Sequence, residues 1–578
     1  MIRYRLDVDA PRGLHTHQFR VTLTVPAPGA EQRLSLPVWI PGSYLVREFA
    51  RHLSGLQVRQ GRRTLPVEQL DKATWLVRCS GRAPLVATWQ VYARDNSVRA
   101  AWLDADRGFF NGTGVFLRVH GREAEPHRLE LGPLPRGWEV ATALAPADGG
   151  WQAAGYDELV DHPVELGRFW RGRFTARGVP HEFVVAGALP GFDGERLLKD
   201  AKRICEAQIA FWHGRGKPPF ERYVFMLNAV EDGYGGLEHR ASTALIANRR
   251  DLPRLGVDAT SEGYATLLGL ISHEYFHTWN VKRLRPADFA RYDYTQENYT
   301  ELLWFFEGFT SYYDDQFLLR TGLIDPARYL KLVAKTVSGV LAMPGRKVQS
   351  VAQASFDAWV KYYRGDENTP NSTISYYTKG SLVGLALDLT LRAEGRGTLD
   401  DVMRGLWARS GGGPVSEADI AAVLKEVSGR SMARELADWV HGTDDLPLQK
   451  LLARFGVGWS AQAPTLAQRL GLRVSESPLT GVKVTSVLRG GEGEAAGLSA
   501  GDELIAVDGW RIRRLDDATR VLPASGEVEL LTVRDGRVRH RAAVVPAAPD
   551  AGAVTLAPEP ATGLAAGALE LRRAWLPG

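Results

Sequence analysis

One short segment, His273-Glu274-Tyr275-Phe276-His277, constrains the fold of this chain more than any other. In a helix, residues four positions apart lie one above the other on the same face, so the imidazoles of His273 and His277 can bind one metal ion. Glu274 lies beside that face, within reach of a water on the metal rather than of the metal itself. The segment is therefore predicted to be helical and to form part of a metal centre.

This pattern is typical of zinc peptidases, in which the glutamate is the general base. A catalytic zinc site takes three protein ligands and keeps a fourth position for water or substrate. Glu307 is the predicted third ligand because it lies within the apolar stretch 302–313, where an unpaired carboxylate is costly. Glu301 is the alternative, but its neighbours are more polar. We therefore predict one Zn²⁺ per chain.

Length and composition limit the remaining possibilities. A chain of 578 residues is too long for one hydrophobic core. The formal net charge of +4 is small and no long Lys/Arg run occurs, so nucleic acid is not an expected partner. Cys79 and Cys205 are the only cysteines and lie in different predicted domains, which excludes a disulfide framework.

The chain shows neither an apolar signal core nor a run of about 18 apolar residues, so we expect no contact with a membrane. A cytoplasmic location is predicted, or a periplasmic one if a leader has been removed. The N-terminal residues 1–7 alternate polar and apolar side chains, which is typical of a strand.

The pattern along the chain predicts a multidomain α+β protein. Residues 1–170 have short alternating runs and Pro/Gly turns, which favour an all-β, sandwich-like domain. Residues 171–450 begin with strands near 181–185 and 223–227 and become helical from about 260 to 445. Residues 451–548 return to short strands and Gly-rich turns. The Ala/Pro/Gly-rich tail 549–578 is left without a structural assignment.

The helix with the two histidines has recognisable end signals. Thr260-Ser261 are good N-caps, and Glu262 falls in the first turn. Asn280 and the following Pro286 are expected to mark its end.

Glu307-Gly308-Phe309 resembles the corresponding segment of the gluzincin metallopeptidases, in which the glutamate is the third zinc ligand. The closer similarity is to the glycyl aminopeptidase family, gluzincins that carry a PDZ domain near the C-terminus. It extends from Trp39-Ile40-Pro41-Gly42-Ser43-Tyr44 to the C-terminal strands. Unlike aminopeptidase N, the chain has a longer gap between His277 and Glu307, and Phe306 replaces an asparagine. The resemblance implies a thermolysin-like catalytic domain and cleavage after an N-terminal glycine or alanine.

Gly235-Gly236-Leu237-Glu238-His239 is similar to the strand of aminopeptidases whose glutamate binds the free α-amine of the substrate. By this resemblance Glu238 is the amine ligand. Gly235 and Gly236 would allow a substrate strand to approach closely. The alternative is a Gly-rich hairpin with a solvated glutamate.

Tyr376-Tyr377-Thr378-Lys379-Gly380 resembles the stretch whose tyrosine donates a hydrogen bond to the tetrahedral oxyanion. This resemblance assigns that role to Tyr377, with Tyr376 as the alternative. A neutral phenol is a suitable donor because it is uncharged at working pH.

Within 451–548, residues 481–512 contain a strand, a short helix, a Gly-Asp turn and a second strand, and this pattern strongly resembles a PDZ domain. Upstream, Leu470-Gly471-Leu472 is a candidate carboxylate-binding loop for the C-terminus of a peptide. The alternative is a PDZ fold that packs on the catalytic domain and binds no peptide.

Together these patterns predict a zinc aminopeptidase that acts on peptides with a free N-terminus. An endopeptidase with the same zinc chemistry is one alternative. A catalytically inactive, PDZ-bearing peptide-binding scaffold is another, although decay usually removes a ligand or the base first.

Overall fold

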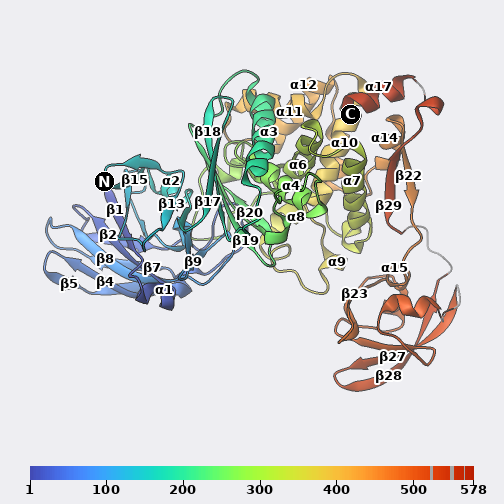
Figure 1. The fold of residues 1–578 in the computed structure, drawn as a ribbon, viewed down its shortest axis with the longest axis horizontal. Helices are drawn as coiled ribbons and strands as arrows, with labels where there is room; N and C mark the ends of the chain where they lie inside the picture. The colour runs from blue at the N-terminus through green and yellow to red at the C-terminus, as the bar shows by residue number, and fades with distance from the viewer. Residues whose placement is uncertain (521, 523–524, 547–551, 565, 578) are drawn as a thin grey trace. The chain divides into compact units, whose positions relative to one another are not determined.

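The computed structural model describes residues 1–520, 522, 525–546, 552–564 and 566–577, and Figure 1 shows their fold. The chain forms two compact units, residues 1–299 with 407–415 and residues 300–406 with 416–578. The predicted α+β class is confirmed. The predicted boundary between residues 548 and 549 lies outside the described residues.

The first 168 residues are rich in β-structure, as predicted, although two short helices, α1 (Arg12–Thr16) and α2 (Tyr156–Val160), interrupt them. The eight-stranded sheet has the order β14 (Ala145–Ala147), β15 (Gly150–Ala153), β12 (His127–Leu131), β1 (Ile2–Asp7), β2 (Gln18–Val25), β8 (Leu85–Tyr92), β4 (Leu53–Gln60), β5 (Arg63–Leu65). The two four-stranded sheets are β13 (Glu139–Ala141), β16 (Val164–Gly167), β10 (Arg107–Phe110), β9 (Ala101–Leu103) and β11 (Arg118–Val119), β3 (Glu31–Ser35), β7 (Thr74–Arg78), β6 (Val67–Asp71).

A mixed five-stranded sheet follows, in the order β17 (Trp170–Ala176), β18 (Val179–Ala186), β19 (Tyr223–Val230), β21 (Ser242–Asn248), β20 (Gly235–Glu238). Strands β18, β19 and β21 are parallel and almost entirely buried, as expected of strands covered on both faces. Strand β20 pairs antiparallel with β21 at the end of the sheet. The predicted strands near 181–185 and 223–227 are confirmed.

Two helices accompany this sheet, α3 (Gly194–His213) and α4 (Glu262–Phe276). The hydroxyl of Ser261 caps α4 by accepting a hydrogen bond from the backbone N–H of Tyr264 at 3.0 Å, as predicted. The helix ends at Phe276, earlier than the predicted Asn280. Turns replace it there, and the N–H of Lys282 donates to the carbonyl of His277 at 3.0 Å.

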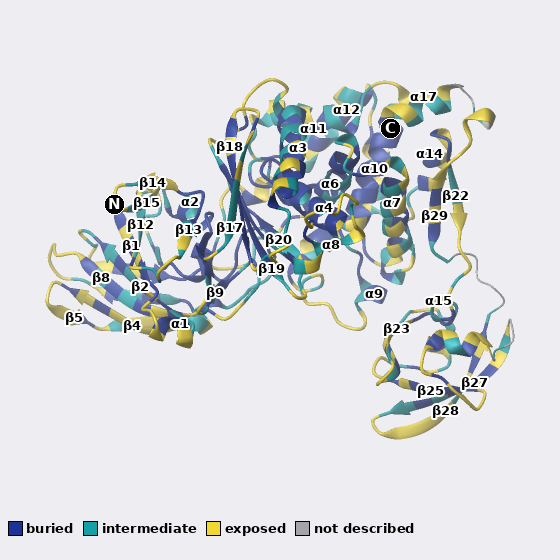
Figure 2. Ribbon diagram, in the orientation of Figure 1, coloured by how far each residue is buried: buried dark blue, intermediate teal, exposed yellow. Residues whose placement is uncertain are grey.

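Helices dominate residues 300–454. They are α5 (Leu303–Phe306), α6 (Gly308–Arg320), α7 (Pro326–Leu341), α8 (Val351–Phe356), α9 (Thr369–Ser372), α10 (Thr378–Glu394), α11 (Leu399–Ser410), α12 (Glu417–Ser428), α13 (Ala433–Leu436) and α14 (Leu448–Arg454). Figure 2 shows that α10 is largely buried, and it packs against α6.

Short strands return after α14. The C-terminal elements are β22 (Val457–Ala461), α15 (Leu466–Leu470), β23 (Leu472–Ser477), β24 (Gly481–Val487), α16 (Glu492–Ala495), β25 (Glu503–Val507), β26 (Trp510–Arg511), β27 (Gly526–Arg534), β28 (Arg537–Val545), β29 (Val554–Pro558) and α17 (Ala566–Trp575). One sheet has the order β23-β24-β25-β27-β28, and β22 pairs with β29. The tail therefore contains regular structure, and the buried ring of Trp575 lies against Tyr329 and Phe455.

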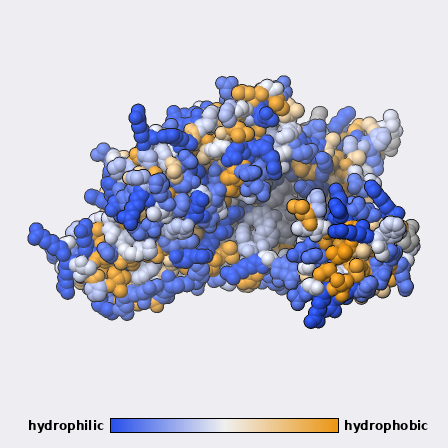
Figure 3. Space-filling view, turned by 60° about the horizontal axis from the view of Figure 1, so that its bottom comes forward, coloured by the Kyte–Doolittle hydropathy of each residue, from blue (hydrophilic) through white to orange (hydrophobic). Residues whose placement is uncertain are grey.

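Hydrophilic side chains cover most of the face shown in Figure 3, and hydrophobic ones form scattered groups. Within the described ranges, no helix has both the length and the apolar character that crossing a membrane requires.

Candidate active site

The structure brings His273, His277 and Glu307 together. Each offers one ligand atom, and these atoms all lie within 4.8 Å of one another. The Nε2 atoms of the two imidazoles are 3.0 Å apart. His277 and Glu307 are only 2% and 1% exposed. Two imidazole nitrogens and a carboxylate oxygen are ligands that zinc accepts in catalytic sites.

The orientation of His277 also fits a metal ligand. Its Nδ1 lies 2.7 Å from the backbone carbonyl of Asn280. A carbonyl only accepts hydrogen bonds, so Nδ1 carries the proton and a neutral ring keeps its lone pair on Nε2. That lone pair faces His273. A histidine held by its other nitrogen in this way is the usual arrangement around protein-bound metals.

Glu274 lies against strand β20. A β-carbon added to Gly236 would overlap the Glu274 carboxylate, which would then have to move from its present position. The side chain of Arg99 reaches the carbonyl of Gly236 at 3.4 Å. Gly236 therefore allows the α4 carboxylate to lie directly beside the backbone of β20.

Glu307 and Tyr377 are positioned by a close crossing of two helices. Glu307 immediately precedes α6, and Tyr377 immediately precedes α10. A β-carbon at Gly308 would lie 2.6 Å from the α-carbon of Gly380, so neither position has room for a side chain. By contrast Glu301, the alternative ligand, is exposed and lies outside the metal-ligand cluster.

The phenol of Tyr377 is suited to donate a hydrogen bond. Burial raises its pKa well above the ordinary value, and the Glu307 carboxylate raises that pKa further. Its hydroxyl is therefore protonated at neutral pH. The hydroxyls of Tyr377 and Tyr363 are 3.4 Å apart. The ring of Tyr376 is fully buried.

Glu238 ends strand β20, at the edge of the five-stranded sheet. It is 3% exposed, and its buried Oε1 has no hydrogen-bond partner among the residues that the structure describes. A buried carboxylate oxygen without a partner is costly unless a ligand supplies a donor. The solvated glutamate of the alternative interpretation is therefore not what the structure has.

Sequence reasoning missed a buried ion pair near Glu238. The Nζ of Lys282 lies 2.6 Å from Oδ1 of Asp161. Burial is the largest single influence on the pKa of Lys282 and lowers it, but Asp161, Tyr292 and Glu238 together outweigh burial and raise that pKa. The backbone N–H of Arg240 donates to Asp161 at 3.0 Å. Asp161 thus ties the residues after Glu238 to those after His277. No sequence signal links these distant segments.

The candidate carboxylate-binding loop is a helix end. Leu470 ends α15, Gly471 is its left-handed cap, and Leu472 begins β23. The N–H of Gly471 donates to the carbonyl of Gln468 at 3.1 Å. That amide is therefore engaged within the cap, and the peptide-carboxylate site stays a prediction.

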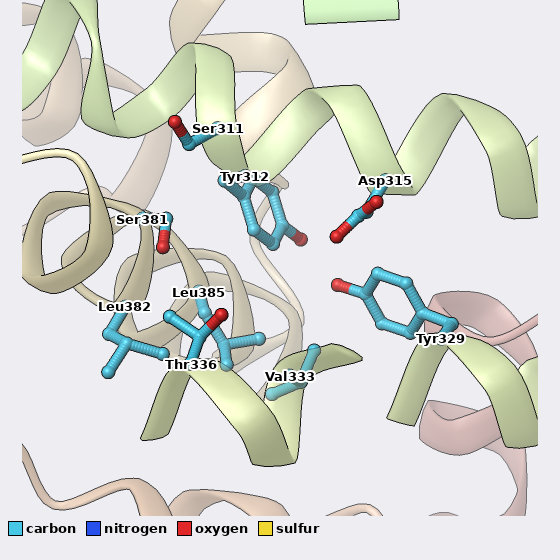
Figure 4. A pocket seen from close by; sticks show the side chains of 9 residues that line it. All are labelled: Ser311, Tyr312, Asp315, Tyr329, Val333, Thr336, Ser381, Leu382 and Leu385. Atoms are coloured by element: carbon cyan, nitrogen blue, oxygen red, sulfur yellow. The ribbon is translucent and has the colours of Figure 1, made fainter. Parts of the chain in front are cut away.

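A small cavity lies apart from these residues. Figure 4 shows it among α6, α7 and α10, where the oxygens of Tyr312, Asp315 and Tyr329 point toward one another. Its volume of about 30 Å³ suits a water molecule and not a peptide. We therefore do not consider it a substrate site.

Two imidazoles, a buried carboxylate and a further glutamate on the histidine helix fit a site of the metallopeptidase type. Family models match residues 266–383 as the M61 glycyl aminopeptidase, 3–168 as the peptidase M61 N-terminal domain and 460–533 as a PDZ domain. The chain belongs to the M61 glycyl aminopeptidase family. It is accordingly a metallo-aminopeptidase with a C-terminal PDZ domain.

The chain is also similar to solved structures. An aminopeptidase N family protein from Idiomarina loihiensis is 36% identical, covers 100% of both chains and has a TM-score of 0.91. An M1 zinc metallopeptidase from Deinococcus radiodurans is 17% identical, with 77% of this chain and 94% of the other covered and a TM-score of 0.45. None of the curated proteins matches the chain.

Proposed function

We propose that the protein is a zinc aminopeptidase that removes one residue, glycine or alanine, from the free N-terminus of a peptide. The observation that carries this proposal is the cluster of His273, His277 and Glu307 ligand atoms within 4.8 Å. When bound there, zinc supplies a Lewis acid that polarises the scissile carbonyl and acidifies water. The preference for glycine or alanine follows from the family and not from a pocket.

Within this mechanism Glu274 is the general base. Its carboxylate takes a proton from the attacking water and returns it to the amine that leaves. The position of Glu274 beside Gly236 supports this role, because a peptide aligned along the edge of β20 would present its backbone to that carboxylate.

Tyr377 is proposed to donate its hydroxyl hydrogen to the oxyanion of the tetrahedral intermediate. Its raised pKa supports this role, because the hydroxyl stays protonated. Replacing Tyr377 with Phe removes the donor and keeps the ring. We expect kcat to fall about 100- to 1000-fold with little change in KM. The matched control is Tyr376→Phe, the alternative donor; a larger loss in that variant would move the assignment to Tyr376.

Glu238 is proposed to bind the substrate's α-ammonium and so to set cleavage one residue from the end. Its buried oxygen without a partner supports this role. Peptides with an acylated N-terminus cannot make this contact, so an aminopeptidase should cleave them poorly. An endopeptidase does not need the contact and would cleave free and acylated peptides alike.

The aminopeptidase proposal is tested by Glu238→Ala. We expect kcat/KM on arylamides with a free N-terminus to fall by about 10- to 100-fold, the loss of one charge-assisted hydrogen bond. Slow cleavage of N-acetylated peptides should stay unchanged. Equal losses on free and blocked substrates would contradict the amine contact, and efficient cleavage of blocked peptides by the unaltered enzyme would favour an endopeptidase.

For the PDZ domain we propose binding of a C-terminal peptide segment by strand addition. Among the described strands, β23 lies at one edge of its sheet and pairs only with β24. An edge strand of this kind offers backbone groups to an added strand. This ligand is separate from the substrate of the zinc site.

A further inference from the structure

A glycine turn lies against the carboxylate of Glu238. Gly42 has a φ of +93°, a conformation that favours glycine. A β-carbon built on Gly42 would lie 2.5 Å from both carboxylate oxygens of Glu238 and 2.7 Å from its Cδ. The turn therefore covers one side of the carboxylate with bare backbone.

The three distances show where that β-carbon would be. Because it would be equally far from both oxygens and only slightly farther from Cδ, it would lie obliquely in front of the carboxylate, toward one of its faces. An ammonium nitrogen that donates to a carboxylate lies about 2.7–2.9 Å from oxygen. A side chain at position 42 would thus overlap the carboxylate and crowd an ammonium nitrogen that approaches it from this side.

The turn is held firmly in place. The N–H of Ser43 donates to the carbonyl of Ile40 at 3.0 Å, and the guanidinium of Arg47 donates to the Ser43 hydroxyl at 2.6 Å. The indole of Trp39 donates to the carbonyl of Asp293 at 2.8 Å. Moving Gly42 away from Glu238 would break several of these hydrogen bonds, so the turn acts as a wall and not as a flexible lid.

We propose that Gly42 is a specificity-determining residue that restricts the Glu238 site to an unsubstituted primary α-ammonium. The inference rests on the proposed role of Glu238. A primary ammonium donates a hydrogen bond to the buried Oε1 of Glu238. Its other substituents that face the Gly42 turn are hydrogen atoms, which are small enough to fit there. An N-methyl group or the ring of an N-terminal proline would meet the Gly42 backbone. Peptides that begin with N-methylated residues or with proline are therefore poor substrates.

Inhibition by small amides tests the proposal without a variant. Glycinamide and its N-methyl analogue sarcosinamide differ by one methyl group on the nitrogen. We expect the enzyme to bind glycinamide at least about 10-fold more tightly than sarcosinamide, as competitive inhibitors of arylamide hydrolysis. Equal inhibition constants would overturn the proposal.

Gly42→Ala adds the obstructing methyl group. We expect glycinamide inhibition to weaken about 10- to 100-fold, and KM for free-N-terminus arylamides to rise more than kcat falls. Gly121→Ala is the matched control, because Gly121 has a φ of +79° and nothing within 4 Å of an added β-carbon. Thermal unfolding and metal content, compared with this control, separate a blocked site from a misfolded protein.

The outcomes also separate this proposal from the proposed function. One outcome is that Glu238→Ala abolishes the tighter inhibition by glycinamide than by sarcosinamide while Gly42→Ala leaves that difference intact. That result would contradict the proposed role of Gly42 and would support the contact between Glu238 and the amine. If Glu238→Ala leaves glycinamide inhibition unchanged, the amine contact fails and the role of Gly42 fails with it.

Discussion

Glu274→Gln is expected to keep one zinc per chain and to lose nearly all turnover. The amide has the shape of the carboxylate but cannot take a proton from the attacking water. We expect kcat to fall on the order of 1000-fold, in the range typical of a lost general base. Glu274 is not among the residues that cluster as metal ligands, so metal affinity should change little.

The measurement pairs steady-state kinetics on a glycine arylamide with metal analysis of the same sample. Glu262→Gln is a suitable control, because Glu262 is an exposed residue in the first turn of the same helix. The control should retain full activity. A metal-loaded Glu274→Gln protein that still turns over at the normal rate would remove the base assignment.

Glu307→Ala is expected to lose both metal and activity. Substituting a residue that only hydrogen-bonds to a metal ligand lowers metal affinity by up to about 100-fold. Removing one of the three ligands themselves should therefore lower zinc affinity by more than about 100-fold. Activity should fall with it, since the remaining histidines hold the ion weakly. Excess zinc should restore only a small part of the rate.

The matched control for this change is Glu301→Ala, the other carboxylate considered as third ligand. Glu301 is exposed, so its removal should leave zinc content and kcat unchanged. Loss of zinc from the Glu301 variant, with retention in the Glu307 variant, would show that the ligand has been assigned to the wrong glutamate.

Local sequence signals predicted much of the fold. Ser261 caps α4 as expected because capping depends on neighbours a few residues apart. The strands β18 and β19 were recognisable from the strand-like runs at 181–185 and 223–227. The end of α4 was predicted too late, because the turns after Phe276 are fixed by hydrogen bonds such as Lys282 to His277 and not by a helix-breaking residue.

Contacts between distant segments could not be predicted in the same way. The metal-binding motif was visible because its spacing is local, but the approach of Gly42 to Glu238 joins segments far apart in sequence. The pairing of Lys282 with Asp161 is equally non-local. The tail gave no periodic signal, yet Trp575 is buried in contact with Phe455. A single sequence does not show which of its distant segments contact each other.

The glycines around the site illustrate the difference. Gly235 and Gly236 were recognised as sites of close backbone approach, but the carboxylate that fills the space at Gly236 was not foreseen. Gly308 and Gly380 each looked like part of a family motif. Their direct contact, which brings Glu307 close to Tyr377, emerges only from the packing of α6 on α10.

Anomalous X-ray diffraction from crystals of the active enzyme, recorded on both sides of the zinc absorption edge, would locate the ion itself. We predict a single strong peak within about 2.0–2.2 Å of ligand atoms from His273, His277 and Glu307. A peak elsewhere, or an active crystal with no anomalous peak between these three side chains, would contradict the zinc site and the hydrolytic mechanism built on it.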